Sequence, residues 1–171
     1  MKKILLLLFF VISTLSFSKW KVGYSDGVIT IVVYSENKLE ILSSKTGIAF
    51  INFQLEKEEL KKIEPTFSMK ELNKLPFVDE LEVFLKVDDN EKIMMKAYKS
   101  SVNQKIVLDV TNGKSPARDD KEQEKLTKIE KQMIEGKELK VTFVKGKNIV
   151  EKTYELKDFK ERFEEAKKKN N

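Results

Sequence analysis

The strongest constraint on the fold of this chain is an alternation of apolar and polar residues with a period of two. It is clearest over residues 80–87, where every second side chain is apolar, at Leu81, Val83, Leu85 and Val87. Only an extended strand sends successive side chains to opposite faces, so the pattern predicts a strand with one buried face. Phe84 is the one large apolar residue on the other, polar face.

Further strands are predicted over residues 48–54, 93–98 and 106–110, which alternate in a similar way. The β-branched run over residues 28–34 is typical of a central strand covered on both faces. Dipeptides that tolerate positive φ separate the runs, as hairpins require: Asp26-Gly27, Glu36-Asn37, Asp89-Asn90 and Asn112-Gly113. Antiparallel strands at intervals of roughly ten residues indicate a sandwich or a barrel.

The C-terminal third predicts two amphipathic helices with a pair of strands between them. A helix between Ser115 and Gly136 has one apolar face, formed by Leu126, Ile129, Met133 and Ile134. Strands are predicted over residues 139–144 and 149–156. The last helix is predicted to begin at Asp158, and its apolar face is formed by Leu156, Phe159, Phe163 and Ala166. We therefore predict a mainly β (α+β) fold, an antiparallel β-sandwich or barrel with two amphipathic helices in the C-terminal third.

The first eighteen residues have the order of a secretory signal peptide. Two lysines precede an apolar run over residues 4–12, and Ser16 and Ser18 place small side chains at the −3 and −1 positions of a cleavage site in front of Lys19. The apolar run is far shorter than the roughly 20 residues that span a bilayer. We expect residues 1–18 to be cleaved and residues 19–171 to form a single β-rich domain, exported to the periplasm or secreted, with no stable membrane anchor.

The composition excludes several kinds of chemistry, because the chain contains neither cysteine nor histidine. Without cysteine there is no disulfide, thiol catalysis or thiolate-ligated zinc, and without histidine there is no Ser-His-Asp catalysis and no histidine-ligated zinc or haem. A domain of this length buries roughly 70% of its unfolded surface and needs no such cross-link. We predict no cofactor and no metal site.

The charge pattern argues against a nucleic-acid partner. The whole chain has a formal net charge of +5, and cleavage of the two signal-peptide lysines would leave +3. Only Arg118 and Arg162 are arginines, whereas arginine is the preferred residue for bidentate contacts with phosphates and bases. Lysine and glutamate are interleaved along the chain, which is typical of a solvated surface.

Two short motifs resemble signatures of the serine β-lactamases and penicillin-binding proteins. Ser35-Glu36-Asn37-Lys38 matches Ser-x-x-Lys, and Lys45-Thr46-Gly47 matches Lys-Thr-Gly. That chemistry requires the serine at a helix start with its lysine one turn later, whereas these residues fall in a predicted hairpin. The chain is also too short for that fold and has no Ser-Asp-Asn element, so we interpret both matches as chance.

A carboxylate cluster is the other route to catalysis. Glu80 and Glu82, next to Asp79, would lie on one strand face roughly 7 Å apart, which is within the range of glycosidase pairs. The opposite face carries the apolar residues, so these carboxylates are expected to face water. A carboxylate-based hydrolase is therefore the third hypothesis for function, and we assign no catalytic residue.

Three further segments have a binding interpretation and a simpler one. Asp88-Asp89-Asn90-Glu91 offers hard oxygens to calcium but lacks the ligand spacing of a dedicated loop, so a solvated turn is expected. Trp20, Val22 and Tyr24 alternate along a first strand and form either an aromatic platform for sugar or peptide or, as we expect, part of the core. Residues 167–171 are expected to be a frayed basic tail.

The C-terminal third also has an ordered series of motifs. The predicted helix is followed by Gly136-Lys137-Glu138-Leu139-Lys140-Val141-Thr142-Phe143, then by Thr153-Tyr154-Glu155-Leu156 and the last helix. With Trp20 near the start of the mature chain, this order resembles exported β-sandwich proteins of the invasion-associated locus B type and of a type VI secretion accessory family. The chain departs from the pattern by lacking cysteines and by having no glycine after the last strand. The resemblance implies a fold and supplies no catalytic residues.

These observations favour an exported bacterial envelope protein with a non-enzymatic binding or accessory role, whose partner is another envelope or secreted protein. The alternative is a small exported inhibitor or ligand carrier. That alternative requires a concave apolar pocket or an ordered exposed loop, which residues 57–76 are best placed to provide.

Overall fold

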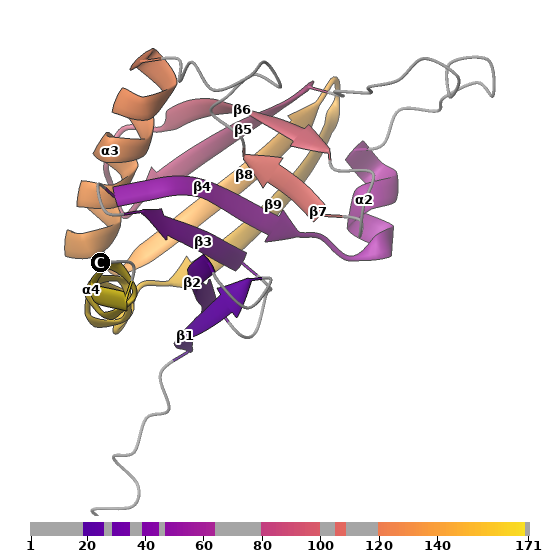
Figure 1. Cartoon of the computed structure of the whole chain (residues 1–171). Coiled ribbons are helices and arrows are strands. Elements are labelled where there is room, and N and C mark those ends of the chain that lie inside the picture. Colours follow the sequence, from indigo (N-terminus) through magenta and orange to yellow (C-terminus); the bar gives the residue numbers. More distant parts are fainter. Residues whose placement is uncertain are drawn as a thin grey trace, which may run out of the picture.

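The computed structural model describes residues 19–25, 29–34, 39–44, 47–63, 80–99, 105–108 and 120–169. The strands are β1 (Trp20–Ser25), β2 (Ile29–Tyr34), β3 (Leu39–Ser44), β4 (Gly47–Gln54), β5 (Glu80–Val87), β6 (Ile93–Lys99), β7 (Lys105–Leu108), β8 (Glu138–Lys145) and β9 (Asn148–Glu155). The helices are α2 (Lys57–Ile63), α3 (Asp120–Glu135) and α4 (Phe159–Lys169). The mainly β prediction and the two C-terminal amphipathic helices are confirmed (Figure 1).

All strand pairs are antiparallel, and the strands follow the order β1-β2-β3-β4-β7-β6-β5-β8-β9. Among the described residues the ladder is shortest between β6 and β7, where Tyr98 pairs with Val107 and Lys99 with Ile106. This short junction joins two halves, β1-β2-β3-β4-β7 and β6-β5-β8-β9. In the described part of the chain β1 and β9, at the two ends of the order, do not pair with each other. The arrangement is therefore sandwich-like rather than a closed barrel.

Aromatic side chains hold the two halves face to face. The ring of Tyr34 on β2 lies 5.3 Å from that of Tyr154 on β9, and Phe53 on β4 lies 5.2 Å from Phe143 on β8, both edge to face. These four side chains are essentially inaccessible to water. Edge-to-face pairs add to the free energy gained by burying the rings, so the contacts fix both the spacing and the relative position of the halves.

The helices close the two ends of the space between the halves, with α3 and α4 at one end and α2 at the other (Figure 1). Each contributes its apolar side to the same connected core, in which the helical members are Leu60, Ile63, Leu126, Ile129, Met133, Phe159, Phe163 and Ala166. The predicted apolar faces of the two C-terminal helices are thus correct, except that Ile134 is only partly buried.

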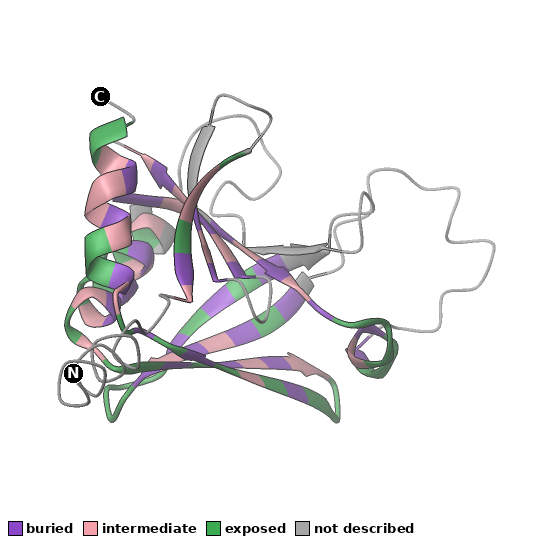
Figure 2. Cartoon of the chain, turned by 90° about the horizontal axis from the view of Figure 1, so that it is seen from below, coloured by how far each residue is buried: buried purple, intermediate pink, exposed green. Residues whose placement is uncertain are grey.

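Buried and less buried residues alternate along the strands as predicted (Figure 2). The alternation is most regular in β5 and β8. In β4 the alternation changes phase, because Leu42 pairs with Phe50 and Ser43 pairs with Ile48, which leaves Ala49 as an extra residue. This bulge allows Ile48 and Ile51 to be buried together. The strand predicted over residues 28–34 is β2, and it lies next to the end strand β1 rather than at the centre of the sheet.

The register of β5 gives the first prediction. Val83 is fully buried, whereas Glu82 is exposed on the opposite face. We expect Val83→Asp to abolish cooperative thermal unfolding, because it places a carboxylate in the core without a partner. Glu82→Ala is the matched control on the neighbouring position and is expected to leave the melting temperature almost unchanged. A folded Val83→Asp protein would show that this register is wrong.

Candidate functional site

The outer face of the half-sheet β6-β5-β8-β9 carries a group of apolar side chains that the core does not use. We call this group the apolar stripe and define it as Met94 on β6, Phe84 on β5, Val144 on β8 and Ile149 on β9. All four side chains point to the outer face of the half-sheet. The residues on both sides of Phe84 and of Met94 are buried, and so are Phe143 before Val144 and Val150 after Ile149.

The strand register makes these four residues neighbours. Phe84 pairs directly with Met94 across β5 and β6, and Val144 pairs directly with Ile149 across β8 and β9. Phe84 pairs with Thr142 on β8, so Val144 is its diagonal neighbour on the same face. Diagonal positions two residues apart remain within reach of an aromatic side chain. The stripe is therefore continuous across four strands.

No described element covers the stripe. Met94 is 40% exposed and Ile149 is 58% exposed, and these are two of the three large apolar side chains with such exposure in the described chain. Phe84 and Val144 are half-buried by their neighbours. Scattered apolar residues are normal on a protein surface, but a contiguous set with a polar rim is characteristic of an interaction site.

Charged residues of both signs surround the stripe on the same face. Lys86 and Lys140 are directly opposite each other on β5 and β8, and Lys140 lies 3.1 Å from the Glu151 carboxylate. The hydrogen bond from Lys140 is the main cause that lowers the pKa of Glu151, and a weaker hydrogen bond from Thr142 acts in the same direction. Glu151 therefore stays ionised, and the rim remains charged, at neutral pH.

A second surface feature lies between β1 and α4. It is an open depression of about 390 Å³ lined by Trp20, Lys21, Val22, Arg162 and Glu165. Trp20 itself is buried, and its ring packs edge to face 4.8 Å from Phe159, which confirms the core interpretation for this residue. Val22 is only partly buried against the core. Tyr24 is 58% exposed, so the core interpretation is wrong for this residue.

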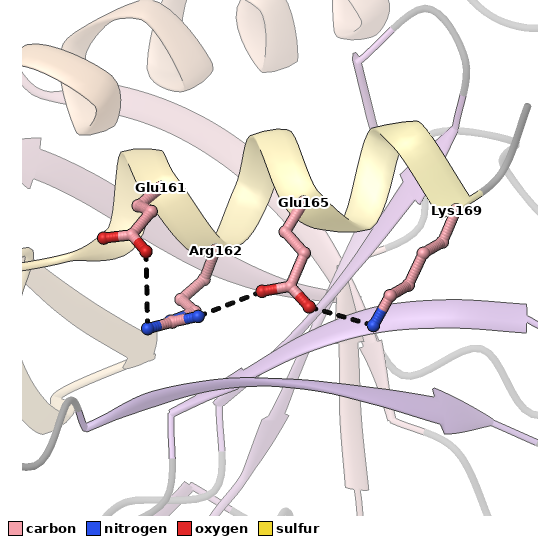
Figure 3. A network of polar contacts seen from close by, with 4 residues as sticks. All are labelled: Glu161, Arg162, Glu165 and Lys169. Atoms are coloured by element: carbon pink, nitrogen blue, oxygen red, sulfur yellow. Dashed lines mark hydrogen bonds and ion pairs between the residues drawn. The ribbon is translucent and has the colours of Figure 1, made fainter.

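Two of the lining residues, Arg162 and Glu165, belong to a row of ion pairs along α4 (Figure 3). Arg162 lies 3.5 Å from Glu161 and 3.0 Å from Glu165, and Glu165 lies 2.9 Å from Lys169. Hydrogen bonds from Lys169 and then Arg162 lower the pKa of Glu165, and the bond to Glu165 raises that of Lys169. The pairs Arg162–Glu165 and Glu165–Lys169 have the i, i+3 and i, i+4 spacings that stabilise a helix surface.

The expectation of a frayed basic tail is wrong for residues 167–169. They form the last turn of α4, where Lys167 lies 2.7 Å from Glu164 and its ammonium lies 5.1 Å from the centre of the Phe163 ring. Lysines at a helix C-terminus also interact favourably with the helix dipole. Residues 170–171 lie outside the described residues.

The predicted carboxylate cluster is dispersed or outside the described residues. Glu82 is exposed on the outer face and pairs across the strands with Lys96 and Val144, in the row of the sheet next to Phe84. Asp79 and the side chain of Glu80 lie outside the description. No cleft therefore brings described carboxylates together at this position.

The β-lactamase-like motifs can be compared with the structure only at their end. Residues 35–38 and 45–46 lie outside the described residues, and Gly47 has a structural role. Its φ is 136°, and a Cβ there would collide with the carboxylate of Glu130, which accepts the Ile48 N–H at 2.8 Å. Glycine at this position lets α3 hold the start of β4.

Asp88 shows that the turn after β5 is more than a solvated loop. Its φ is 47°, and its carboxylate accepts the backbone N–H groups of Lys137 at 3.0 Å and Glu138 at 2.9 Å. The side chain therefore fixes the start of β8. Gly136 makes the approach possible, because a Cβ there would collide with the side chain of Val87.

A partly buried polar group lies at the other end of the sandwich. Lys152 on β9 and Glu59 on α2 form an ion pair of 2.8 Å with side-chain exposures of 13% and 25%. Next to it, burial raises the pKa of Tyr154, with a smaller effect from the charge of Glu59. The pair attaches α2 to the inner face of β9, and α2 is the described part of the stretch over residues 57–76 that could provide a binding loop.

Comparisons with known proteins assign neither a family nor a function to the chain. No protein-family model matches the chain, and neither the curated proteins nor the solved structures give a match. Within the described residues, no group of three or more acidic side chains is close enough to hold a metal ion. None of the described helices combines the length and the apolar character needed to cross a membrane.

The Asp88 contacts give the second prediction. We expect Asp88→Ala to lower the melting temperature by several degrees, because it removes the acceptor of two backbone N–H groups and places alanine at positive φ. Asp89→Ala is the control, since the Asp89 carboxylate is fully exposed and lies 4.0 Å from Lys86. Equal melting temperatures for the two variants would contradict a role for Asp88 in positioning β8.

Proposed function

We propose that this protein is an exported bacterial envelope protein that acts by binding another envelope or secreted protein, without catalysis. The observation that carries the proposal is the apolar stripe on the outer face of β6-β5-β8-β9. Those side chains contribute little to the core, and their exposure to water costs free energy that burial against a partner recovers.

The shape and chemistry of the face support a protein partner. The stripe runs across four strands as a continuous band, and charged groups border it, which matches the apolar centre and polar rim of many protein interfaces. Phe84 lies in the middle of the band, between Met94 and Val144. Buried aromatic anchors near the centre of an interface often supply much of the binding energy.

Export is the second part of the proposal, and it rests on the signal-peptide pattern of residues 1–18. β1 begins at Trp20, so cleavage between Ser18 and Lys19 would remove no strand residue. Lys19 itself lies 3.3 Å from Glu155. The cleavage would therefore leave the described fold complete.

Cleavage gives the third prediction. The intact mass of the exported protein is expected to equal that of residues 19–171. Ser18→Phe should accumulate as the uncleaved precursor, because a large side chain does not fit the −1 position, whereas Ser18→Ala should be processed normally. A mature protein that retains residues 1–18, or that is found only in the cytoplasm, would contradict export by this signal.

Binding through the stripe gives the fourth prediction. A photo-cross-linking phenylalanine analogue placed at position 84 of the full-length protein, in cells of the native host, is expected to capture one defined protein. The same analogue at Lys160, an exposed position on α4, serves as the control and is expected not to capture it. Mass spectrometry identifies the captured protein, which is then purified for binding measurements.

In those measurements Phe84→Ser and Ile149→Thr are each expected to weaken binding by about tenfold or more, since each removes an apolar contact at the interface. Their melting temperatures should change little because both side chains are outside the core. Glu124→Ala, on the exposed side of α3, is the control for binding. Unchanged affinity in both stripe variants would refute the stripe as the binding site.

The depression between β1 and α4 favours a second candidate function, a small inhibitor or ligand carrier. Its volume of about 390 Å³ is within the range of small-molecule sites, and it joins an apolar floor at Trp20 and Val22 to the charged wall of α4. The exposed ring of Tyr24 extends the same edge of the molecule. A ligand at this site would leave the Phe84 and Ile149 variants with normal binding.

A further inference from the structure

We infer that the partner contributes an extended segment that adds a strand to the edge of β9 beside Ile149. This inference deepens the proposed function and rests on it, because this edge is where the apolar stripe ends. It assigns to the site a class of ligand, a β-strand of another protein, in place of an unspecified apolar surface.

The hairpin between β8 and β9 determines which backbone groups of β9 point away from β8. Gly146 and Lys147 form a two-residue loop, in which Gly146 has a φ of 58°, and Lys145 pairs with Asn148 across it. In such a hairpin the flanking residues exchange both hydrogen bonds, and bonded and non-bonded pairs then alternate. The N–H and C=O groups that point away from β8 are therefore those of Ile149, Glu151, Thr153 and Glu155.

Glu155 provides an independent check of this alternation. Its C=O accepts the indole N–H of Trp20 at 2.8 Å, and its N–H donates to the hydroxyl of Tyr34 at 3.4 Å. Both backbone groups therefore point away from β8, as the hairpin geometry requires. At this end of β9 the outward groups are taken by side chains from β1 and β2.

At the other end of β9, the backbone N–H and C=O groups of Ile149 and Glu151 point toward the strand edge that faces away from β8. In the part of the chain that the structure describes, β9 pairs only with β8, so no strand occupies this side. α2 is attached to β9 further along, at the ion pair between Glu59 and Lys152. The open edge and the exposed side chain of Ile149 thus form one continuous surface with the apolar stripe.

The geometry of the edge selects the occupant. An extended backbone presents N–H and C=O groups at the spacing of a neighbouring strand, whereas a helix uses these groups internally. In the added strand, the residue opposite Ile149 would continue the apolar stripe and should be apolar. The residue opposite Val150 would contact the edge of the core and should also be apolar. The residue opposite Glu151 should be lysine or arginine, as favourable cross-strand pairs require.

A proline substitution separates the strand contact from the side-chain contact. Glu151→Pro removes one outward N–H and leaves the ladder to β8 intact, which is the position that proline tolerates in an edge strand. Glu151→Ala removes the same carboxylate and keeps the N–H. We expect Glu151→Pro to bind the protein captured through position 84 more than about tenfold more weakly than Glu151→Ala does, at similar melting temperatures.

Amide hydrogen exchange in the whole protein supplies a second readout. In the free protein the amides of Ile149 and Glu151 should exchange faster than those of Val150 and Lys152, which are bonded to β8. Addition of the purified protein captured through position 84 should slow exchange at Ile149 and Glu151. Protection at both amides together with weak binding of Glu151→Pro would support strand addition.

The remaining outcomes distinguish this inference from the proposed function. Equal affinities of Glu151→Pro and Glu151→Ala, with Phe84→Ser still defective, would overturn strand addition and leave the stripe as the site. Normal binding by Phe84→Ser and Ile149→Thr, or no capture at position 84, would overturn both. Recovery of only a second copy of this chain would replace the separate partner by a dimer through β9.

Discussion

The contact between Trp20 and Glu155 is the interaction on which the arrangement of the two half-sheets depends. The indole is buried, packs against Tyr34 at 5.0 Å and Phe159 at 4.8 Å, and donates its N–H to a backbone carbonyl at the end of β9. A buried indole N–H without an acceptor would cost about 1–3 kcal/mol, so the ring needs β9 at this position. One side chain therefore joins the first strand, the last strand and the last helix.

The same contact divides the edge of β9 into two parts. An unpaired strand edge is an aggregation hazard, and proteins reduce it by covering it or by placing charges along it. Here the end near Glu155 is covered through Trp20 and Tyr34, and α2 is attached near Lys152. The end near Ile149 has charges instead, from Glu151 and from the lysines at and beside the turn. That protection limits indiscriminate pairing while the backbone stays accessible to a strand with matching side chains.

Much of the fold could be predicted from the sequence, because its main determinants are local. The alternation in β5, the apolar faces of the C-terminal helices and the glycine in the turn between β8 and β9 are all visible as patterns. The junction between the half-sheets is not visible, since within the described residues it consists of two residue pairs between β6 and β7. The bulge at Ala49 is also a property of pairing with β3, so the sequence of β4 alone could not reveal it.

The candidate site was harder to predict, because it also depends on contacts between distant parts of the chain. Phe84 is conspicuous in the sequence as an apolar residue on a polar face, but Val144 and Ile149 fall within runs that are typical of buried strands. Their meaning depends on register between strands that are up to about 60 residues apart in the chain, and a shift of one residue would reverse the face of each. Asp88 is a similar case, because its role requires contact with the start of β8.

The hairpin of β8 and β9 contributes to both the core and the proposed binding surface. Its inner face supplies Phe143 and Tyr154 to the aromatic core, and its outer face supplies Val144 and Ile149 to the stripe. Because side chains alternate strictly between these faces, the two sets can vary independently, provided that the register is kept. The outer residues could therefore match the chemistry of the proposed partner while the inner ones preserve the sandwich.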